Sequence, residues 1–238
     1  MRCARGADRV NPRLKFCTMW IVPIMIAFWA LFIGLAVFLI VYNKRKEKER
    51  TQALQQLAAT LGWSFAPTAP MNQIAGLELF TLFSQGHSKQ IKNFMYGQAQ
   101  GVKAAVFDYI YVTGSGKSQQ THYQTVVYLE PLNLALPMFS LRPESLFHRM
   151  LSAFGYQDID FGQRPEFSQL YILRGQNEPA IRQTFNDRVL SFFEGYAGTC
   201  VDAGGNQLFV YRAGQRFQPP EIEGHVGIGL HAMNLLRH

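Results

Sequence analysis

The longest apolar run of the chain lies near its N-terminus and contains no charged residue. It covers residues 21–42, IVPIMIAFWALFIGLAVFLIVY. As an α-helix, a run of this length extends for about 33 Å, which matches the hydrocarbon core of a bilayer. A buried core helix is usually shorter, and the apolar part of a cleaved signal peptide is shorter too and is followed by small residues. The pattern therefore predicts a transmembrane helix over residues 20–43 that stays attached to the chain.

Aromatic and basic side chains mark the ends of this run. Trp20 precedes it and Tyr42 closes it, and such rings prefer the headgroup level of a membrane. A basic cluster follows at once and consists of Lys44, Arg45, Lys46, Lys48 and Arg50. These side chains are the candidate membrane-interface residues, and the cluster predicts attraction to anionic lipid headgroups. Within the run, Ala30 and Gly34 form a small-residue pair through which two anchors could meet as a homodimer.

The polar segment after the anchor also has a helical pattern. Arg45 and Glu49 are four residues apart, a spacing at which opposite charges support a helix. Apolar side chains then recur at helical spacing, at Leu54, Leu57 and Leu61. This segment predicts a charged helical stalk over residues 44–62.

The chain is therefore expected to have four parts. They are a basic tail (1–19), a transmembrane helix (20–43), the stalk (44–62) and a soluble domain (63–238). The last part carries most of the apolar periodicity, so a fragment of residues 63–238 is expected to fold alone. Aggregation of that fragment would instead place the leucines of the stalk in the core of the domain.

From about residue 76 the apolar positions alternate with a period of two, which is typical of β-strands. Separators rich in Gly, Ser and Gln divide the region, and such short turns join antiparallel strands. APTAP, residues 66–70, is interpreted as a linker or turn before them. The expected strands of this meander are 77–83, 90–97, 102–114 and 121–130.

Helical and extended patterns alternate in the rest of the chain. Helices are predicted for 143–154, for a segment that Asn177 caps and that runs to about Phe192, and for 220–236. Short strands are expected at 138–141, 158–161 and 168–175, followed by a hairpin at 200–214. The fold class predicted is α+β, with an antiparallel sheet covered by helices.

The net charge of +7 is not spread over the chain. Residues 1–19 contain five basic and one acidic side chain, and residues 44–50 contain five basic and two acidic ones. The remaining residues, 51–238, contain equal numbers of each, so the domain has no overall positive field for a phosphate backbone. No nucleic-acid partner is expected.

No motif in the sequence indicates a cofactor or a metal site. The three cysteines, Cys3, Cys17 and Cys200, do not have metal-ligand spacing, and neither do His225 and His231. The GSGKS run at 114–118 resembles the end of a phosphate-binding loop, but a strand pattern follows it instead of a helix. It is interpreted as a hairpin turn, and neither a cofactor nor a metal is expected.

One polar pair is a candidate for catalysis. Asp108 interrupts an apolar row on the strand that starts at Val102, and a tight turn at 114–118 would place His122 across from it. A carboxylate and an imidazole in contact could perform acid–base chemistry. The alternatives are a strand that faces water at this point, or an Asp whose oxygens accept hydrogen bonds from backbone donors.

The arrangement resembles a class of uncharacterised bacterial single-pass inner-membrane proteins with a C-terminal α+β domain. The runs that carry the resemblance are FDYIYVTG, LPMFSLRPE and DIDFGQRPEFSQLYILRG, within about residues 79–192. The resemblance implies a location in the bacterial inner membrane and implies no activity.

These observations favour a membrane-tethered binding or scaffold domain. The alternative is an enzyme that acts on membrane-derived substrates at Asp108 and His122. Equal numbers of basic side chains flank the span, but those on the C-terminal side lie closer to it, and translation from Met19 would remove the others. The domain is therefore predicted to face the cytoplasm.

Overall fold

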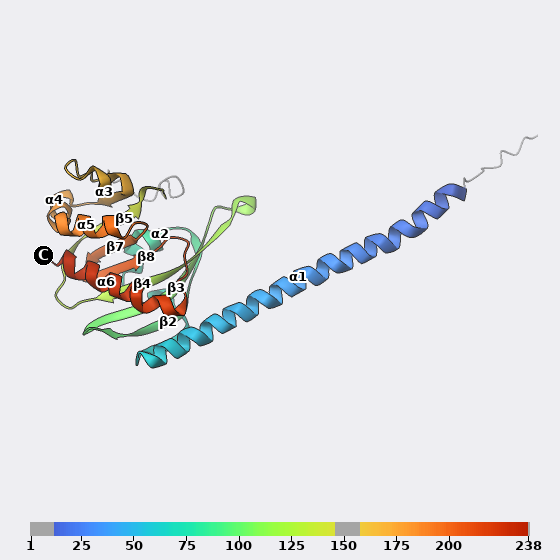
Figure 1. Cartoon of the computed structure of the whole chain (residues 1–238), viewed down its shortest axis with the longest axis horizontal. Helices are drawn as coiled ribbons and strands as arrows, with labels where there is room; N and C mark the ends of the chain where they lie inside the picture. The colour runs from blue at the N-terminus through green and yellow to red at the C-terminus, as the bar shows by residue number, and fades with distance from the viewer. Residues whose placement is uncertain (1–11, 146–157, 238) are drawn as a thin grey trace, which may run out of the picture. The chain divides into compact units, whose positions relative to one another are not determined.

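The computed structural model describes residues 12–145 and 158–237, with side chains from residue 25 onward. The chain divides into two compact units, Met1–Arg50 and Thr51–His238. Helix α1, Pro12–Thr60, runs through the first unit, and its last turns belong to the second (Figure 1).

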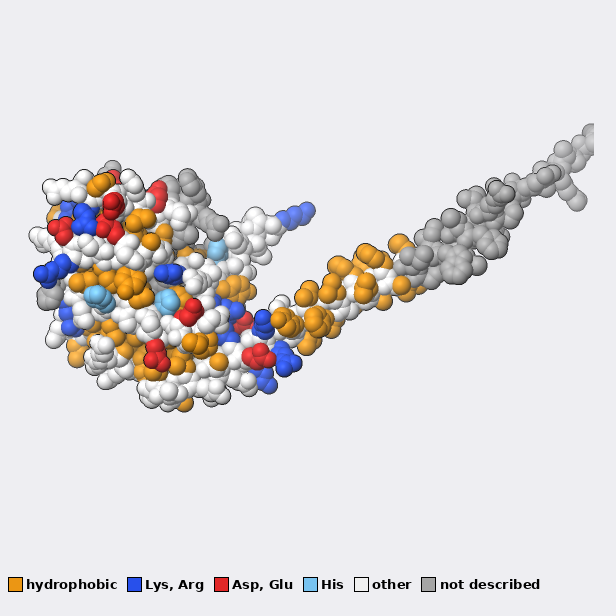
Figure 2. Space-filling view, viewed as in Figure 1, with side chains coloured by type: hydrophobic (Ala, Val, Ile, Leu, Met, Phe, Trp, Pro, Cys, Tyr) orange, Lys and Arg blue, Asp and Glu red, His pale blue; other side chains and the backbone are white. Residues whose placement is uncertain are grey.

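Helix α1 is apolar on all sides between Met25 and Tyr42. The large apolar side chains of this stretch are 45–73% exposed, and hydrophobic atoms cover its visible face until charged side chains begin (Figure 2). Among the described residues, α1 is the one helix that is long and apolar enough to cross a membrane. A helix that is hydrophobic all round and is not packed on its own protein is typical of a membrane span, and an N-terminal signal sequence has the same composition.

The second unit contains an eight-stranded sheet with the strand order β1-β2-β3-β4-β8-β7-β5-β6. Every neighbouring pair is antiparallel, and helices cover the sheet, so the prediction of an α+β fold with an antiparallel sheet is confirmed. The strands are β1 Ser64–Ala69, β2 His87–Ala99, β3 Val102–Thr113, β4 Gln120–Glu130, β5 Leu136–Pro143, β6 Tyr171–Gly175, β7 Cys200–Gly205 and β8 Gln207–Tyr211.

The expected meander is present from β2 to β4, but its first strand was predicted wrongly. LELFTLF, residues 77–83, forms the 3-10 helix η2, Leu77–Leu79, and the short helix α2, Thr81–Ser84. Gly76 turns the chain into η2 with a φ of 71°, in the left-handed region that glycine tolerates. The side chains at 77, 80 and 83 are then buried at a spacing of three, which suits helical turns.

APTAP was predicted as a linker or turn, and this was also wrong. Residues 66–69 lie within β1, which pairs with β2 from Ser64 opposite Tyr96 to Ala69 opposite Ile91. Strand β1 is an edge strand of the sheet. On the outer side of an edge strand, the missing N–H of Pro67 does not interrupt a ladder of hydrogen bonds. The prolines that indicated a turn are therefore compatible with an edge strand.

The region after β5 differs from the prediction in several places. Pro143 is the last residue of β5, Glu144 and Ser145 have 3-10 helical conformation, and residues 146–154 of the predicted helix lie outside the described residues. Residues 158–161 are not a strand. Residues 168–170 of the predicted strand 168–175 belong to α3, Pro165–Leu170, and β6 begins at Tyr171.

The helix that Asn177 caps is two helices. Asn177 accepts a hydrogen bond from the Ala180 N–H and starts α4, Glu178–Thr184. A second capping residue, Asn186, accepts from the N–H groups of Arg188 and Val189 and starts α5, Asp187–Gly195. Asn186 starts a second helix because its side chain satisfies N–H groups at the N-terminus of α5. Apolar periodicity alone does not reveal such a break between helices.

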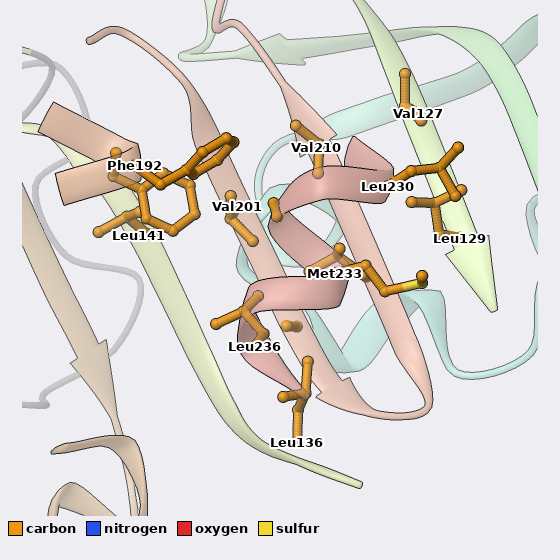
Figure 3. Packing of buried hydrophobic residues seen from close by; sticks show 14 of the residues in the cluster. Val127, Leu129, Leu136, Leu141, Phe192, Val201, Val210, Leu230, Met233 and Leu236 are labelled. Atoms are coloured by element: carbon orange, nitrogen blue, oxygen red, sulfur yellow. The ribbon is translucent and has the colours of Figure 1, made fainter. Parts of the chain in front are cut away.

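One face of the sheet packs against α3, α4, α5 and the last helix, α6, Ile222–Leu236 (Figures 1 and 3). We call this the helix-side core. The predicted apolar face of α6 is buried there, at Ile222, Val226, Leu230 and Met233. Gly229 allows close packing, because a Cβ at that position would lie 3.2 Å from Leu129 Cδ1 on β4.

The opposite face packs against the segment that contains η2 and α2, and we call it the aromatic core. Phe83 of α2 stacks edge-on against Tyr109 and Phe209, with ring centroids 4.8 and 5.1 Å apart. Phe80 packs on Phe209 at 4.7 Å. Such ring pairs add to the stabilisation that burial itself provides.

The last turns of α1 also belong to the helix-side core. Leu54 is 2% exposed and Ala58 is fully buried in it, and Leu57 packs at its margin. The compact unit that contains this core begins at Thr51.

We predict that Leu54→Ala lowers the free energy of unfolding of a fragment of residues 51–238 by about 2–5 kcal/mol, because it leaves a cavity in a packed core. Denaturant unfolding measures the effect. The exposed neighbour Gln55 provides the control, and Gln55→Ala should leave stability nearly unchanged. Equal stabilities of the two variants, or a fragment of residues 63–238 as stable as 51–238, would contradict the assignment of Leu54 to the core.

Candidate functional site

The candidate membrane-interface side chains lie on α1, and from Tyr42 to Lys48 they are exposed. Lys46 Nζ lies 5.0 Å from the centroid of the Tyr42 ring, and Arg45 Nε donates to Glu49 Oε1 at 2.9 Å. The predicted pair at i,i+4 is thus present. Trp20 lies in the part of α1 whose side chains are not described. The exposed side chains of Lys44 and Lys48 can meet lipid headgroups or water.

The predicted pair Asp108 and His122 is not brought together. The register of β3 and β4 places Asp108 opposite Thr125 and His122 opposite Tyr111. Positions 108 and 111 differ by three residues, so their side chains point to opposite faces of the sheet and are separated by roughly 10 Å along the strand. The acid–base centre proposed for these two residues is therefore not formed.

Asp108 instead belongs to a buried hydrogen-bond network on the helix side. Its Oδ2 accepts from Asn93 Nδ2 at 2.9 Å, and its Oδ1 accepts from Thr125 Oγ1 at 2.7 Å. Thr125 Oγ1 in turn accepts from the N–H of Phe217 at 3.0 Å, and Thr51 Oγ1 of α1 donates to Asn93 Oδ1 at 2.8 Å. A buried carboxylate with several donors is a structural element that ties α1, β2, β3 and β4 together.

His122 lies on the other face, stacked on Tyr111 with ring centroids 4.7 Å apart. Its Nε2 lies 2.7 Å from Thr113 Oγ1. The GSGKS run forms the predicted hairpin turn, in which Ser118 Oγ donates to the Ser115 carbonyl before β4 begins. No group of three His, Cys, Asp or Glu side chains in the described ranges could hold a metal ion.

The polar cluster with the most unusual geometry lies in the aromatic core. Arg142 of β5 is 8% exposed, and its Nη2 donates to both carboxylate oxygens of Asp202 on β7, at 2.8 and 2.7 Å. Asp202 is fully buried, and its Oδ2 also accepts from the N–H of Leu82 at 2.9 Å. Burial lowers the pKa of Arg142, but the carboxylate of Asp202 outweighs this effect and raises the pKa overall.

Three further polar side chains adjoin this ion pair. Cys200 pairs with Tyr211 across β7 and β8, and the Arg142 Cζ lies 4.9 Å from the centroid of the Tyr211 ring. Tyr111 approaches from β3. Burial raises the pKa of all three groups, although the positive charge of Arg142 lowers each of them in part. Cys200 therefore stays a thiol and is not an activated nucleophile, and both tyrosines keep their protons.

Sequence reasoning did not identify Arg142 or Asp202 as functional residues. A weak signal was present, since an Arg follows the apolar run MFSL and an Asp interrupts the strand CVDAGG. The two lie 60 residues apart in the chain, and only the pairing of β5 with β7 shows that they meet.

Comparison with known proteins gives one informative likeness. No family model matches the chain, and no curated protein matches it in sequence. Among solved structures, the chain resembles the crystal structure of the mycobacterial trehalose monomycolate transport factor A, TtfA, with a TM-score of 0.56 and 14% identity. The match covers 79% of this chain and 94% of that one, and at this identity it shows a shared fold.

We predict that Asp108→Asn lowers the free energy of unfolding by about 1–3 kcal/mol, because an amide turns a donor toward a group that already donates. Denaturant unfolding of residues 51–238 measures it. Asp160→Asn, at an exposed position, is the matched control and should be neutral. If Asp108→Asn were as stable as the control, the network would not hold these elements together.

Proposed function

We propose that this chain is a binding or scaffold domain that α1 tethers to the bacterial inner membrane, and that it has no catalytic activity of its own. The observation that carries the proposal is the exposed apolar surface of α1 between Met25 and Tyr42, which charged residues follow directly along the helix. Such a surface is stable in lipid and not in water.

The likeness to TtfA supports a role of the same general kind. The printed name of that protein describes a transport factor, and the likeness of fold extends over most of both chains. By this analogy we propose that the domain assists the movement or assembly of another molecule at the membrane. The proposal carries over the kind of role and leaves the identity of that molecule open.

Two further features support attachment to a membrane surface. The exposed basic side chains after Tyr42 would attract anionic headgroups, each by about 1 kcal/mol near the surface. A Cβ at Gly34 would meet nothing within 4 Å, so the Ala30 and Gly34 pair leaves room for a second copy of α1. We propose both contacts as parts of the anchor.

The alternative of an enzyme centred on Asp108 and His122 receives no support from the geometry. The register sends the two side chains to opposite faces, and Asp108 is occupied by Asn93 and Thr125.

The tether is tested by fractionation of cells that produce the full chain or residues 51–238. We expect the full chain to remain in the membrane pellet after extraction with alkaline carbonate, and residues 51–238 to appear in the soluble fraction. A full chain that is released by carbonate, or that is cut after α1, would refute the tether.

The orientation is tested separately by fusions after His238. With the domain in the cytoplasm, as the basic cluster after Tyr42 favours, a fluorescent protein that fails when exported should be bright. A phosphatase that needs the periplasm should then be inactive at the same position. The reverse pattern would mean that the N-terminal basic residues outweigh the cluster.

A further inference from the structure

The hairpin of β3 and β4 extends beyond the rest of the sheet. These strands pair as far as Thr113 opposite Gln120, whereas β8 accompanies β4 only between Val126 and Leu129. All residues from 114 to 121 are exposed, and the hairpin projects from the body of the second unit (Figure 1). A two-stranded projection of this kind buries little apolar surface, so it adds little to the stability of the core. A contact with something outside the domain would explain its length.

The charge of the second unit is unevenly distributed. Residues 51–238 contain equal numbers of basic and acidic side chains, yet residues 79–129 contain four lysines and one acidic residue, the buried Asp108. Lys103 lies at the end of β3 that is far from the turn, where it pairs with Glu130 at 3.8 Å. The half of these strands toward the turn holds the other lysines, which are Lys89, Lys92 and Lys117. Even when the charge of Asp108 is included, this half of β2 to β4 has a surplus of positive charge.

The turn presents a basic side chain at its tip. Lys117 is exposed and belongs to the 3-10 helix η3, Gly116–Ser118, and Figure 2 shows a basic side chain at the end of the projection. Farther along β4, Tyr123 is 45% exposed, and the Arg216 Cζ lies 5.5 Å from the centroid of its ring. Exposed aromatic rings and cations are typical of surfaces that meet lipid headgroups.

The tether joins the second unit from the same end of the sheet. Thr51 Oγ1 donates to Asn93 Oδ1 at 2.8 Å, and Trp63 Nε1 donates to the Gln98 carbonyl at 3.1 Å. From Thr51 to Trp63 the chain therefore runs in the same direction as β2, which begins at His87 beside the last residues of β3. Followed backward from Thr51, the chain leaves the unit at the end where the β3–β4 turn lies.

The hairpin is long enough to reach the level of the headgroups. Thr51 is linked to Asp108 through Asn93. From Asp108, β3 continues for five residues to Thr113, which is about 17 Å, and the turn follows. From Thr51, α1 continues for nine residues back to Tyr42, which is about 13 Å. The two lengths are comparable, so the tip can meet the headgroups around Tyr42 while the network of Asp108 stays intact.

We propose that the β3–β4 turn, with Lys117 at its tip, lies on the anionic phospholipid surface of the membrane that holds α1. This contact rests on the tether proposed above and is made by the domain itself. One basic side chain near an anionic surface favours contact only about fivefold, which is too little to hold a free domain. The tether keeps the surface at a high effective concentration, so even a weak contact is populated. Held at two points, the domain would keep one orientation on the membrane.

The test uses the full chain in lipid nanodiscs and measures how closely two labelled positions approach the headgroups. A fluorophore is attached either to Gln119→Cys, in the turn, or to Asn133→Cys, beyond the far end of β4; both positions are exposed. Cys3→Ser and Cys17→Ser remove competing thiols, and Cys200 is fully buried. Lipids with a nitroxide on the headgroup quench a fluorophore that lies close to them. In nanodiscs rich in phosphatidylglycerol, we expect strong quenching at position 119 and weak quenching at position 133.

A pair of matched variants identifies the side chain responsible. Lys117→Gln should lower the equilibrium constant of the contact, measured from quenching at position 119, about fivefold, because it removes the charge at the tip. Lys103→Gln, at an exposed lysine on the far end of β3, is the control and should leave quenching unchanged. High salt or uncharged lipid should also reduce quenching of the wild type, because each weakens the attraction between exposed charges.

Equal quenching at positions 119 and 133, in a chain that remains in the nanodisc, would overturn the contact and leave the tether intact. The hairpin would then be open to a protein partner instead of lipid. Quenching at position 119 that neither Lys117→Gln nor the charge of the lipid alters would overturn the contact as well. A chain that does not remain in the nanodisc would refute the tether and, with it, this contact.

Discussion

The second unit depends on burying both faces of one large antiparallel sheet. Helices α3 to α6 and the last turns of α1 cover one face, and the short segment with η2 and α2 covers part of the other. Both covers contribute aromatic rings. Phe185 and Phe193 lie on the helix side, where the aliphatic side chains of α6 join them, and Phe83 packs on Tyr109 and Phe209 on the other side. A slip of one residue in a strand would turn its side chains to the opposite face. Because each core is closely packed, each cover therefore fixes the register of the strands beneath it.

Long periodic segments were predicted well from the sequence because one physical signal determined each of them. The apolar run at 21–42, the alternation in β3 and β4, and the four apolar positions of α6 each depend on local spacing. Short segments were predicted poorly because tertiary packing decided them. LELFTLF alternates like a strand, yet Gly76 and the burial of Phe80 and Phe83 turn it into helical turns. APTAP has the composition of a turn, yet residues 66–69 form part of the edge strand β1.

The candidate site shows the same division between local and distant causes. The alternation of β3 correctly indicated that Asp108 is unusual, because a carboxylate stands in an apolar row. Its partners were not predictable, since Asn93 reaches it from a bulge of β2 with a φ of 50°, and Thr51 supports Asn93 from α1. A β-bulge leaves no periodic signal in the sequence. The same is true of a contact between residues 42 positions apart, such as that of Thr51 with Asn93.

The two buried polar groups of the domain differ in a way that bears on function. The network of Asp108 on the helix side has donors matched to acceptors, and such a network rigidifies a fold. The ion pair of Arg142 and Asp202 on the other side leaves donors unmet, and apolar residues of similar volume would often be as stable as such a pair. Stability alone therefore explains the first group and does not explain the second. A pair of this kind specifies one arrangement of β5, β7 and the segment around α2, because the Leu82 N–H and Arg142 Nη2 meet at Asp202 only in that arrangement.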